Sequence, residues 1–288
     1  MLRGLYTAAS GMIAQQRRHD TVTNNIANIH TPGYKQTNAV TRSFPEMLLS
    51  ITGVNQAERT TVGRWTSGVF AEESLSIHLQ GDLTQTNQSS DFALISNIEV
   101  DGLAFDASGK AIGADGVPVY QPQAFFTVQD GNGDIRYTRG GKFTVTGDGF
   151  LMTSDGSNVL GTNGAPIQLP PGVGLDSLIL TEDQRFVDSN GAEIGAQLLI
   201  TRIENPNDLV REGNGNFRFV DDRGQAQPIA AGERVEVRQG YVERSNVDSA
   251  QAAVDLMSAL RAYEANQKVI QFYDQSLQKA ANEVGRVG

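Results

Sequence analysis

The 288-residue sequence contains no cysteine, which excludes a disulfide framework, a thiol nucleophile and a thiolate metal site. Basic residues are also few: 23 Lys and Arg stand against 33 Asp and Glu, a formal net charge of −10. Binding to nucleic acid needs clustered basic side chains, so this balance argues against it. The three histidines, His19, His30 and His78, lack the close pairing of a metal site.

Long apolar runs are missing as well. No segment approaches the roughly 18 to 20 apolar residues that span a membrane, so we expect no membrane insertion. The stretch 4–14 is mildly apolar, but Thr7, Ser10 and Gly11 dilute it and no convincing cleavage site follows. We therefore expect no cleaved signal peptide, and any export would use a route that needs none.

Catalytic constellations are equally scarce, and no plausible Ser-His-Asp arrangement is present. The segment 130–134, Asp-Gly-Asn-Gly-Asp, begins like a calcium loop, but Ile135 stands at the sixth position and Gly141 at the twelfth. A hairpin turn is the better interpretation. We predict no enzyme, no catalytic residue, no cofactor and no metal site.

The sequence does have heptad spacing at its C-terminal end. An apolar row seven residues apart comprises Leu256, Tyr263, Ile270, Leu277 and Val284. We expect a companion row at Ala253, Leu260, Gln267, Asp274 and Ala281. The two rows predict one long helix, with Ser245 or Asn246 as its N-cap.

A second heptad pattern lies at the N-terminal end. One row comprises Leu5, Met12, His19 and Ile26, and the other comprises Ala8, Gln15, Val22 and Ile29. Thr31-Pro32-Gly33 should end this helix, because the residue before proline disfavours the α conformation and Gly33 suits a turn. The two apolar faces either close on each other within one chain or pair with other copies.

Between the ends, short runs rich in Val, Ile, Phe and Thr alternate with Gly, Asp and Asn turns. Hairpins are predicted for 125–129 with 134–138 and for 142–146 with 150–153, and a further turn at Arg223-Gly224. Later strands are predicted at 198–203, 216–220 and 234–238.

The predicted fold class is α+β. Paired N- and C-terminal helices form a helical-bundle or coiled-coil domain and flank a central all-β domain of short antiparallel strands, a partly open barrel or a sandwich. The N-terminal helix of the core domain takes residues 1–35, and an irregular arm with a short helix near 46–51 takes 36–68. The central β domain takes 69–238, and the C-terminal helix of the core domain takes 239–288.

Three segments resemble the flagellar rod and hook family of bacterial axial proteins. Residues 24–35, Asn-Asn-Ile-Ala-Asn-Ile-His-Thr-Pro-Gly-Tyr-Lys, are similar to its N-terminal signature, and 240–247 with 261–266 are similar to its C-terminal signature. Residues 137–143, Tyr-Thr-Arg-Gly-Gly-Lys-Phe, resemble the central region of rod proteins. In length, the chain is more similar to rod proteins of the distal and proximal type than to the hook protein. Compared with the rod proteins, residues 97–123 look like an insertion.

The resemblance implies a structural component of the flagellar basal-body rod, in the cell envelope, that self-assembles through its terminal helices into a helical tube transmitting motor torque. Its implied partners are copies of itself, other axial proteins of rod and hook, and the flagellar export apparatus. The residues expected at subunit interfaces are Leu5, Met12, Asn24, Asn25, Ile26, Asn28, Tyr34, Leu256, Tyr263, Asn266, Ile270 and Leu277.

Among these residues, the four asparagines and Tyr34 are expected to set the register between subunits. The alternatives left open are a hook-type protein, a secreted β domain that binds a cell-wall polysaccharide, and an enzyme of the cell wall.

Overall fold

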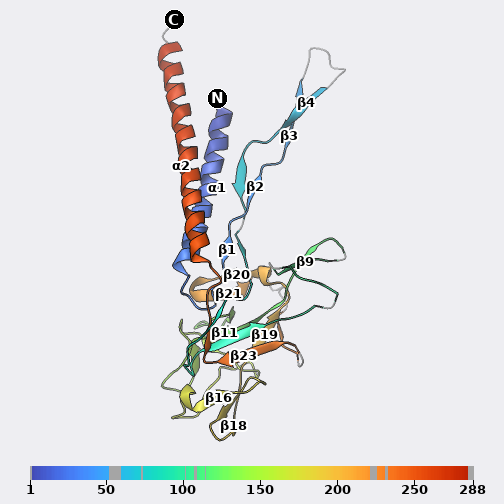
Figure 1. The fold of residues 1–288 in the computed structure, drawn as a ribbon, viewed down its shortest axis with the longest axis vertical. Helices are drawn as coiled ribbons and strands as arrows, with labels where there is room; N and C mark the ends of the chain where they lie inside the picture. Colours follow the sequence, from blue (N-terminus) through green and yellow to red (C-terminus); the bar gives the residue numbers. More distant parts are fainter. Residues whose placement is uncertain are drawn as a thin grey trace. The chain divides into compact units, whose positions relative to one another are not determined.

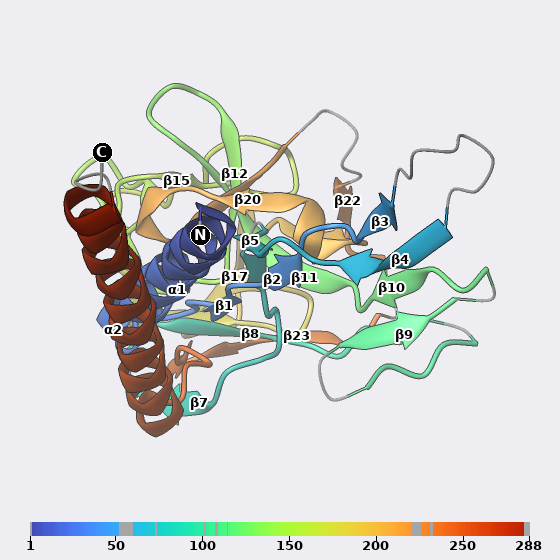
Figure 2. The same cartoon turned by 90° about the horizontal axis from the view of Figure 1, so that it is seen from above.

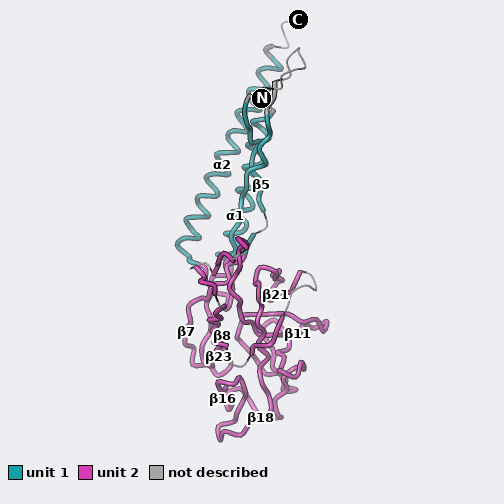
Figure 3. Tube along the Cα trace, turned by 90° about the vertical axis from the view of Figure 1, so that its right-hand side faces the viewer, with its two compact units in different colours: residues 1–27, 37–75, 248–288 teal, residues 28–36, 76–247 magenta. Residues whose placement is uncertain are grey.

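The computed structural model describes residues 2–51, 60–72, 74–100, 102–106, 109–113, 115–220, 226–230 and 233–284. Its chain divides into two compact units (Figure 3). Unit 1 comprises Met1–Ala27, Thr37–Leu75 and Asp248–Gly288, and unit 2 comprises Asn28–Gln36 and Ser76–Val247. The chain therefore enters unit 2 twice, and unit 1 is assembled from three separate stretches.

The prediction of paired terminal helices that form a helical-bundle domain is wrong. The structure has one helix at each end, α1 (Leu2–Ala27) and α2 (Ser249–Lys279), flanking a mostly β region (Figure 1). Unit 1 is not purely helical, because α1 contacts strand β5 (Val69–Ala71) as well as α2. Strand β5 thus lies beside α1, where a further helix would lie in a helical bundle. The α+β class itself fits.

The α2 surface that faces α1 uses a different companion row from the predicted one. The apolar row Leu256, Tyr263, Ile270 and Leu277 is half-buried, but the predicted companions 253, 260, 267, 274 and 281 are exposed. The residues that accompany the apolar row lie one position earlier in the sequence than predicted. They are Ala252, Ala259, Asn266 and Tyr273. Gln267 and Asp274 thereby stay in water, and the small side chains of Ala252 and Ala259 take the buried positions. The side chain of Val284 lies outside the described residues.

Small residues on α1 allow the two helices to approach closely. A Cβ atom on Gly4 would overlap the Tyr273 side chain, and one on Gly11 would lie 3.0 Å from Asn266 Nδ2. Further along the same contact, Arg18 Nη2 on α1 donates to Asp255 Oδ1 on α2 at 2.8 Å. Residue numbers rise along α1 as they fall along α2, so the two helices are antiparallel.

Helix α2 begins two or three residues later than predicted. Its N-cap is Asp248, whose side chain accepts hydrogen bonds from the backbone N–H groups of Ala250 and Gln251, rather than Ser245 or Asn246. A carboxylate at this position satisfies two otherwise unpaired donors and interacts favourably with the helix dipole. The last turn is a π-helical segment, Ala280–Val284.

The strands of unit 1 form two short antiparallel ladders, one enclosing the other along the chain. β2 (Thr41–Ser43) pairs with β5, and β3 (Met47–Ile51) pairs with β4 (Thr60–Trp65). The short helix predicted near 46–51 is therefore wrong, because these residues extend to form ladder hydrogen bonds with β4. Two further short strands are β1 (Thr37–Asn38) and β6 (Leu75–Ser76).

Unit 2 is built from short antiparallel strands. They are β7 (Leu83–Gln85), β8 (Phe92–Ser96), β9 (Lys110–Ile112), β10 (Pro118–Tyr120), β11 (Gln123–Gln129), β12 (Ile135–Thr138), β13 (Phe143–Val145), β14 (Leu151–Thr153), β15 (Asn158–Val159), β16 (Leu178–Leu180), β17 (Arg185–Asp188), β18 (Glu193–Gln197), β19 (Ile200–Ile203), β20 (Leu209–Arg211), β21 (Asn216–Phe219), β22 (Ala226–Pro228), β23 (Val235–Gln239) and β24 (Tyr241–Glu243). Three 3₁₀ turns join them: η1 (Leu175–Ser177), η2 (Pro206–Asp208) and η3 (Gly213–Gly215).

In place of a single barrel or sandwich, the described strands form one nine-stranded sheet and several small ones. The main path is β13-β14-β15-β11-β12-β21-β20, with β19 joining β11 to β22. β16, β17 and β18 form a three-stranded sheet, and β8 pairs with β23 and β7 with β24. In the inserted-looking segment, β9 and β10 lie side by side as a hairpin (Figure 2).

The predicted hairpins are confirmed. β11 pairs antiparallel with β12, and β13 with β14. The predicted later strands correspond to β19, β21 and β23. The segment 130–134 is a turn, as expected, in which Asp130 Oδ1 accepts the backbone N–H groups of Asn132 and Asp134. The turn predicted at Arg223-Gly224 lies outside the described residues.

Strand β11 separates two apolar cores because successive side chains of a strand point to opposite faces. Phe126 enters the larger core, where its ring centroid is 5.2 Å from that of Phe143. Phe125 enters the smaller core, 5.7 Å from Phe217. The strand is therefore buried on both faces, which fits its unbroken apolar stretch.

Replacing Asp248 with alanine should lower the stability of unit 1 by about 1 kcal/mol, because two N–H groups of the first turn of α2 lose their acceptor. Chemical denaturation followed by helical circular dichroism would measure the change. Glu264→Ala, an exposed change in the middle of the same helix, is the matched control and should have a smaller effect. Equal effects would contradict the capping role.

Candidate functional site

A buried ionic cluster joins the three segments that carry the family resemblance. Lys35 Nζ donates to Glu243 Oε1 at 2.5 Å, and Arg139 donates to Glu243 Oε2 through Nε at 3.0 Å. The side chains of Lys35 and Arg139 are 1% exposed and that of Glu243 is 0% exposed. We name Lys35, Arg139 and Glu243 the ionic cluster. All three residues belong to unit 2.

The remaining hydrogen-bonding capacity of the ionic cluster is used by backbone groups and by the Ser96 hydroxyl, which accepts from Arg139 Nη1 at 3.2 Å. Arg139 Nη1 donates to the Ala124 carbonyl at 2.7 Å and Nη2 donates to the Leu94 carbonyl at 3.0 Å. Lys35 Nζ donates to the Leu79 carbonyl at 2.7 Å, and Glu243 Oε1 accepts the Gly81 N–H at 2.9 Å. A buried charge is tolerated when it is both paired and hydrogen-bonded in this way.

Burial and the neighbouring charges shift the pKa values of Lys35 and Glu243. Burial, together with repulsion from Arg139, lowers the pKa of Lys35 to about 8, although Glu243 opposes the shift. Burial would raise the pKa of Glu243, but the charges of Arg139 and Lys35 outweigh it and hold that pKa below its usual value. Glu243 is therefore ionised at neutral pH and holds both cations.

Glycine is required where the backbone approaches the ionic cluster. Gly33 has a φ of +70° and donates its N–H to the Glu243 carbonyl at 2.8 Å. A Cβ atom there would lie 2.5 Å from the Arg139 carbonyl carbon, which is closer than atoms approach without displacement. A side chain on Gly141 would likewise collide with the Phe92 carbonyl. Gly33 thus allows the N-terminal motif to pack against the 137–143 segment, and Gly141 allows that segment to pack against β8.

A third cation, Arg211, reinforces the N-terminal motif. The Arg211 guanidinium lies 4.1 Å from the Tyr34 ring centroid and donates to the Lys35 carbonyl. Burial lowers the pKa of Arg211. The cation–π contact and the hydrogen bond together hold Tyr34 and Lys35 in place beside β20.

Asn246 joins three chain segments through its side-chain amide. Its Oδ1 accepts the Gln36 N–H at 2.6 Å, and its Nδ2 donates to the carbonyls of Ile77 at 2.9 Å and Leu79 at 3.2 Å. Both sides of the amide are therefore satisfied by backbone. The residue expected to cap a helix instead fixes the connection between the N-terminal motif and β24.

The predicted register residues form their described contacts within the chain itself. Asn25 Nδ2 donates to the Thr37 carbonyl at 2.8 Å, and Asn28 Oδ1 accepts the Thr31 hydroxyl at 3.1 Å. Asn266 contacts α1 beside Gly11. Asn24 is exposed on α1, Tyr34 is buried near Arg211, and Leu5, Met12 and Ile26 are half-buried. Their role between subunits stays a prediction.

His78 is a half-buried histidine whose two ring nitrogens are shielded from solvent and have no hydrogen-bonding partner among the described residues. Its ring lies 6.2 Å from Phe125 and 5.9 Å from Phe217, measured between centroids. Burial, together with the positive charges of Lys35, Arg211 and Arg139, lowers its pKa to about 3. His78 is therefore neutral at physiological pH and packs as an aromatic ring.

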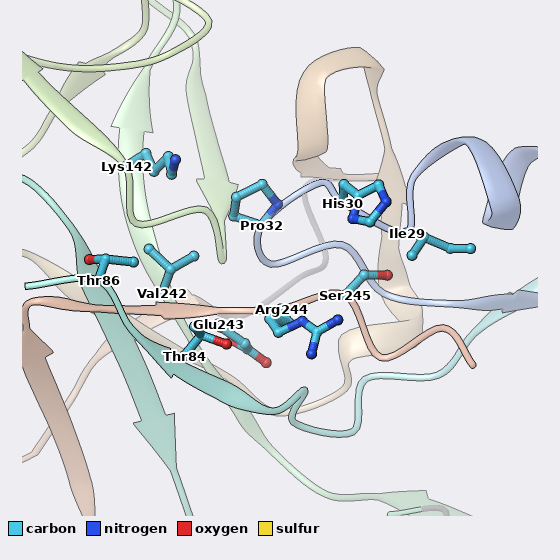
Figure 4. A pocket seen from close by; sticks show the side chains of 10 residues that line it. All are labelled: Ile29, His30, Pro32, Thr84, Thr86, Lys142, Val242, Glu243, Arg244 and Ser245. Carbon is cyan, nitrogen blue, oxygen red and sulfur yellow. The ribbon is translucent and has the colours of Figure 1, made fainter. Parts of the chain in front are cut away.

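A pocket of about 300 Å³ borders the ionic cluster (Figure 4). It is lined by Ile29, His30, Pro32, Thr84, Thr86, Lys142, Val242, Glu243, Arg244 and Ser245.

Within the described ranges, no three Asp, Glu or His side chains gather closely enough to hold a metal ion. Neither described helix has the length and apolar character that crossing a membrane requires.

Sequence reasoning did not single out the ionic cluster, although each member lies inside a segment quoted for the resemblance. The available signal was a charged residue beside a glycine or an aromatic residue in two of the three motifs: Lys35 after Tyr34, and Arg139 before Gly140. Which charges meet depends on the tertiary fold, because 208 positions separate Lys35 from Glu243.

Three family models match the chain. "Flagella basal body rod protein" matches residues 5–35, "Flagellar hook protein FlgE/F/G D1 domain" matches 121–183, and "Flagellar basal body rod FlgEFG protein C-terminal" matches 238–283. Each matched range contributes one member of the ionic cluster: Lys35, Arg139 and Glu243 respectively.

Curated relatives match over almost the whole chain. The flagellar hook-basal body complex protein FlhO of Bacillus subtilis (strain 168) is 39% identical over 291 residues, covering 100% of both chains. The flagellar basal-body rod protein FlgG of the same strain is 29% identical, covering 98% of this chain and 99% of that protein. FlgG of Borreliella burgdorferi is 31% identical, covering 98% of each.

Glu243→Gln should lower the free energy of unfolding by about 3 to 5 kcal/mol, because Lys35 and Arg139 would remain buried without their counter-ion. Urea denaturation followed by circular dichroism would measure it. The control Glu236→Gln, which removes an exposed ion pair with Arg238, should cost less than about 1 kcal/mol. Similar losses in both variants would contradict a structural role for the ionic cluster.

His78 should make the protein less stable in mild acid. The unfolded state binds a proton near pH 6.5 and the folded state only near pH 3, so stability falls as pH drops through this window. Between pH 7 and pH 5, this residue should cost about 2 kcal/mol. His78→Phe should remove that part of the slope in denaturation at both pH values, whereas the control His19→Gln should retain it.

Proposed function

Because the chain belongs to the flagellar basal-body rod protein family, and is accordingly a structural protein of that rod, we propose that it assembles with copies of itself and other axial proteins into a helical tube that transmits motor torque. Identical head-to-tail contacts that do not close into a ring generate such a filament. In this tube residues 69–238 form the wall, 1–35 and 239–288 form the core, and 36–68 lie between them.

The observation that carries the proposal is the apolar surface that unit 1 leaves uncovered. On α2, large apolar side chains outside the row that faces α1 are exposed: Val254, Met257, Leu260, Val269 and Phe272. Tyr6 and Ile13 are exposed on α1. Exposed apolar side chains in this number, on two helices, are typical of a protein–protein interface.

The half-buried residues complete the proposed interface. Leu256, Tyr263, Ile270 and Leu277, with Leu5, Met12 and Ile26, hold α1 against α2 and keep part of their surface for a neighbouring copy. Asn24, Asn25, Asn28, Tyr34 and Asn266 set the register of that contact. Support for the interface comes from the heptad spacing of its apolar residues.

The proposal also covers what the protein does not do. It has no catalytic activity, leaves the cell through the flagellar export apparatus without a cleaved signal peptide, and does not insert into a membrane. Its sequence supports these points: it offers no nucleophile–base arrangement, no convincing cleavage site and no apolar run of membrane-spanning length.

Phe272→Asp should prevent incorporation into the basal body while leaving the fold intact, because the side chain is 66% exposed and a charge there opposes burial against a neighbour. An immunoblot of purified hook-basal bodies, with washed cell wall and cytosol alongside, would compare wild type and variant. A motility assay and a melting curve complete the test.

Asn132→Asp adds the same charge at an exposed polar position of the β11–β12 turn in unit 2 and should be incorporated normally. Wild-type protein in the wall fraction, and absent from basal bodies, would overturn the proposed function. A Phe272→Asp variant that still builds motile flagella would overturn the role of the exposed α2 surface.

A further inference from the structure

The pocket beside the ionic cluster carries positive charge without a described partner. We propose that it receives an acidic turn of a second copy of this chain, with Glu182 and Asp183 of that copy pairing with Lys142 and Arg244. The proposal rests on the self-assembly argued above and identifies one contact within it. It concerns unit 2 alone, since all lining residues and the acidic turn belong to that unit.

Two exposed cations line the pocket. Lys142 and Arg244 form no ion pair with any described residue, and Figure 4 shows them on either side of Pro32 and Val242. Asp82 accepts the Arg244 backbone N–H at 2.8 Å through its own carbonyl, but its carboxylate forms no ion pair with that side chain within the described residues. In a chain with net charge −10, such a site favours an anionic partner.

The acid in the pocket wall does not cancel this charge. Glu243 directs its carboxylate to Lys35, Arg139 and the Gly81 N–H, which together use both of its oxygens. Lys35 and Arg139 supply two positive charges against one negative charge. The wall behind the pocket is thus positive as well, and Glu243 is not available to pair with Lys142 or Arg244.

The size and the remaining lining limit what can enter. About 300 Å³ is at the small end of ligand pockets and suits one or two side chains rather than a whole segment. Ile29, Pro32 and Val242 supply apolar contact, and the hydroxyls of Thr84, Thr86 and Ser245 supply hydrogen bonds. A carboxylate side chain on a tight turn matches this combination of short reach, apolar stem and anionic end.

The chain itself offers such a turn between β16 and β17. Glu182 and Asp183 are consecutive and exposed, and neither carboxylate forms a hydrogen bond or ion pair with a described residue. The turn is held in shape by hydrogen bonds from Gln184 N to the Thr181 carbonyl at 2.9 Å and from Gln197 Nε2 to the Asp183 carbonyl at 2.9 Å. A turn already ordered loses little entropy when it binds.

Pocket and turn are different surfaces of one unit, so their contact between copies is heterologous. Every subunit whose turn is bound still offers its own pocket to the next subunit. Repetition therefore extends a row of subunits wherever the rotation from one subunit to the next does not close a ring. This is the kind of contact that a tube wall requires.

The test is a charge exchange in the purified full-length chain, with self-association measured by sedimentation velocity over a range of concentrations and salt. Lys142→Glu with Arg244→Glu should weaken association about tenfold or more, and Glu182→Lys with Asp183→Lys should do the same. Combining all four changes should restore association, because the charges are exchanged rather than lost. Wild-type association should weaken as salt increases.

Lys110→Glu and Asp115→Lys, exposed charge reversals in the β9–β10 hairpin, are the matched controls and should associate like wild type. Melting curves confirm that each variant is folded. Wild-type-like association of either double variant, no gain on combining them, or no association of the wild-type chain overturns the proposal. The basal-body immunoblot decides the proposed function separately, since it depends on where the protein resides and not on these charges.

Discussion

The stability of unit 2 depends on the carboxylate of Glu243. It holds Lys35 and Arg139 in the interior, and these residues come from three segments far apart in the chain. Removing it would leave two buried cations without a counter-charge, which is far more costly than losing an exposed pair. The three family models match around these residues, so the most recognisable parts of the sequence converge on one buried interaction.

A buried ionic cluster is costly to desolvate, and an apolar replacement of similar volume can be equally stable. The contribution of the ionic cluster here is to select one geometry for the segments that it joins. Charges and fixed hydrogen bonds accept one geometry, whereas apolar side chains accept several. Gly33 and Asn246 add constraints of the same kind, one through close backbone packing and one through an amide bonded on both sides. The N-terminal motif is thereby held in a single register against β24.

The elements predicted correctly from the sequence are those with local signals. Alternating apolar residues and Gly-rich turns identify the β11–β12 and β13–β14 hairpins, and heptad spacing identifies both helices. The companion row on α2 was missed by one residue, because closeness of approach favours Ala252 and Ala259 over Leu260, a preference that periodicity does not contain. The ionic cluster was missed since its members meet only in the tertiary fold.

The interleaving of the two units has a consequence for the order of events during synthesis. The N-terminal end of a chain leaves the ribosome first, so residues 28–36 emerge early. Unit 2 can be completed only after residues 76–247 have followed. Unit 1 waits longer still, because its third stretch begins at Asp248. Helix α1 must therefore spend nearly the whole of translation without α2. Contacts of such long sequence separation form slowly, and the nascent chain needs protection for its exposed apolar surface until they do.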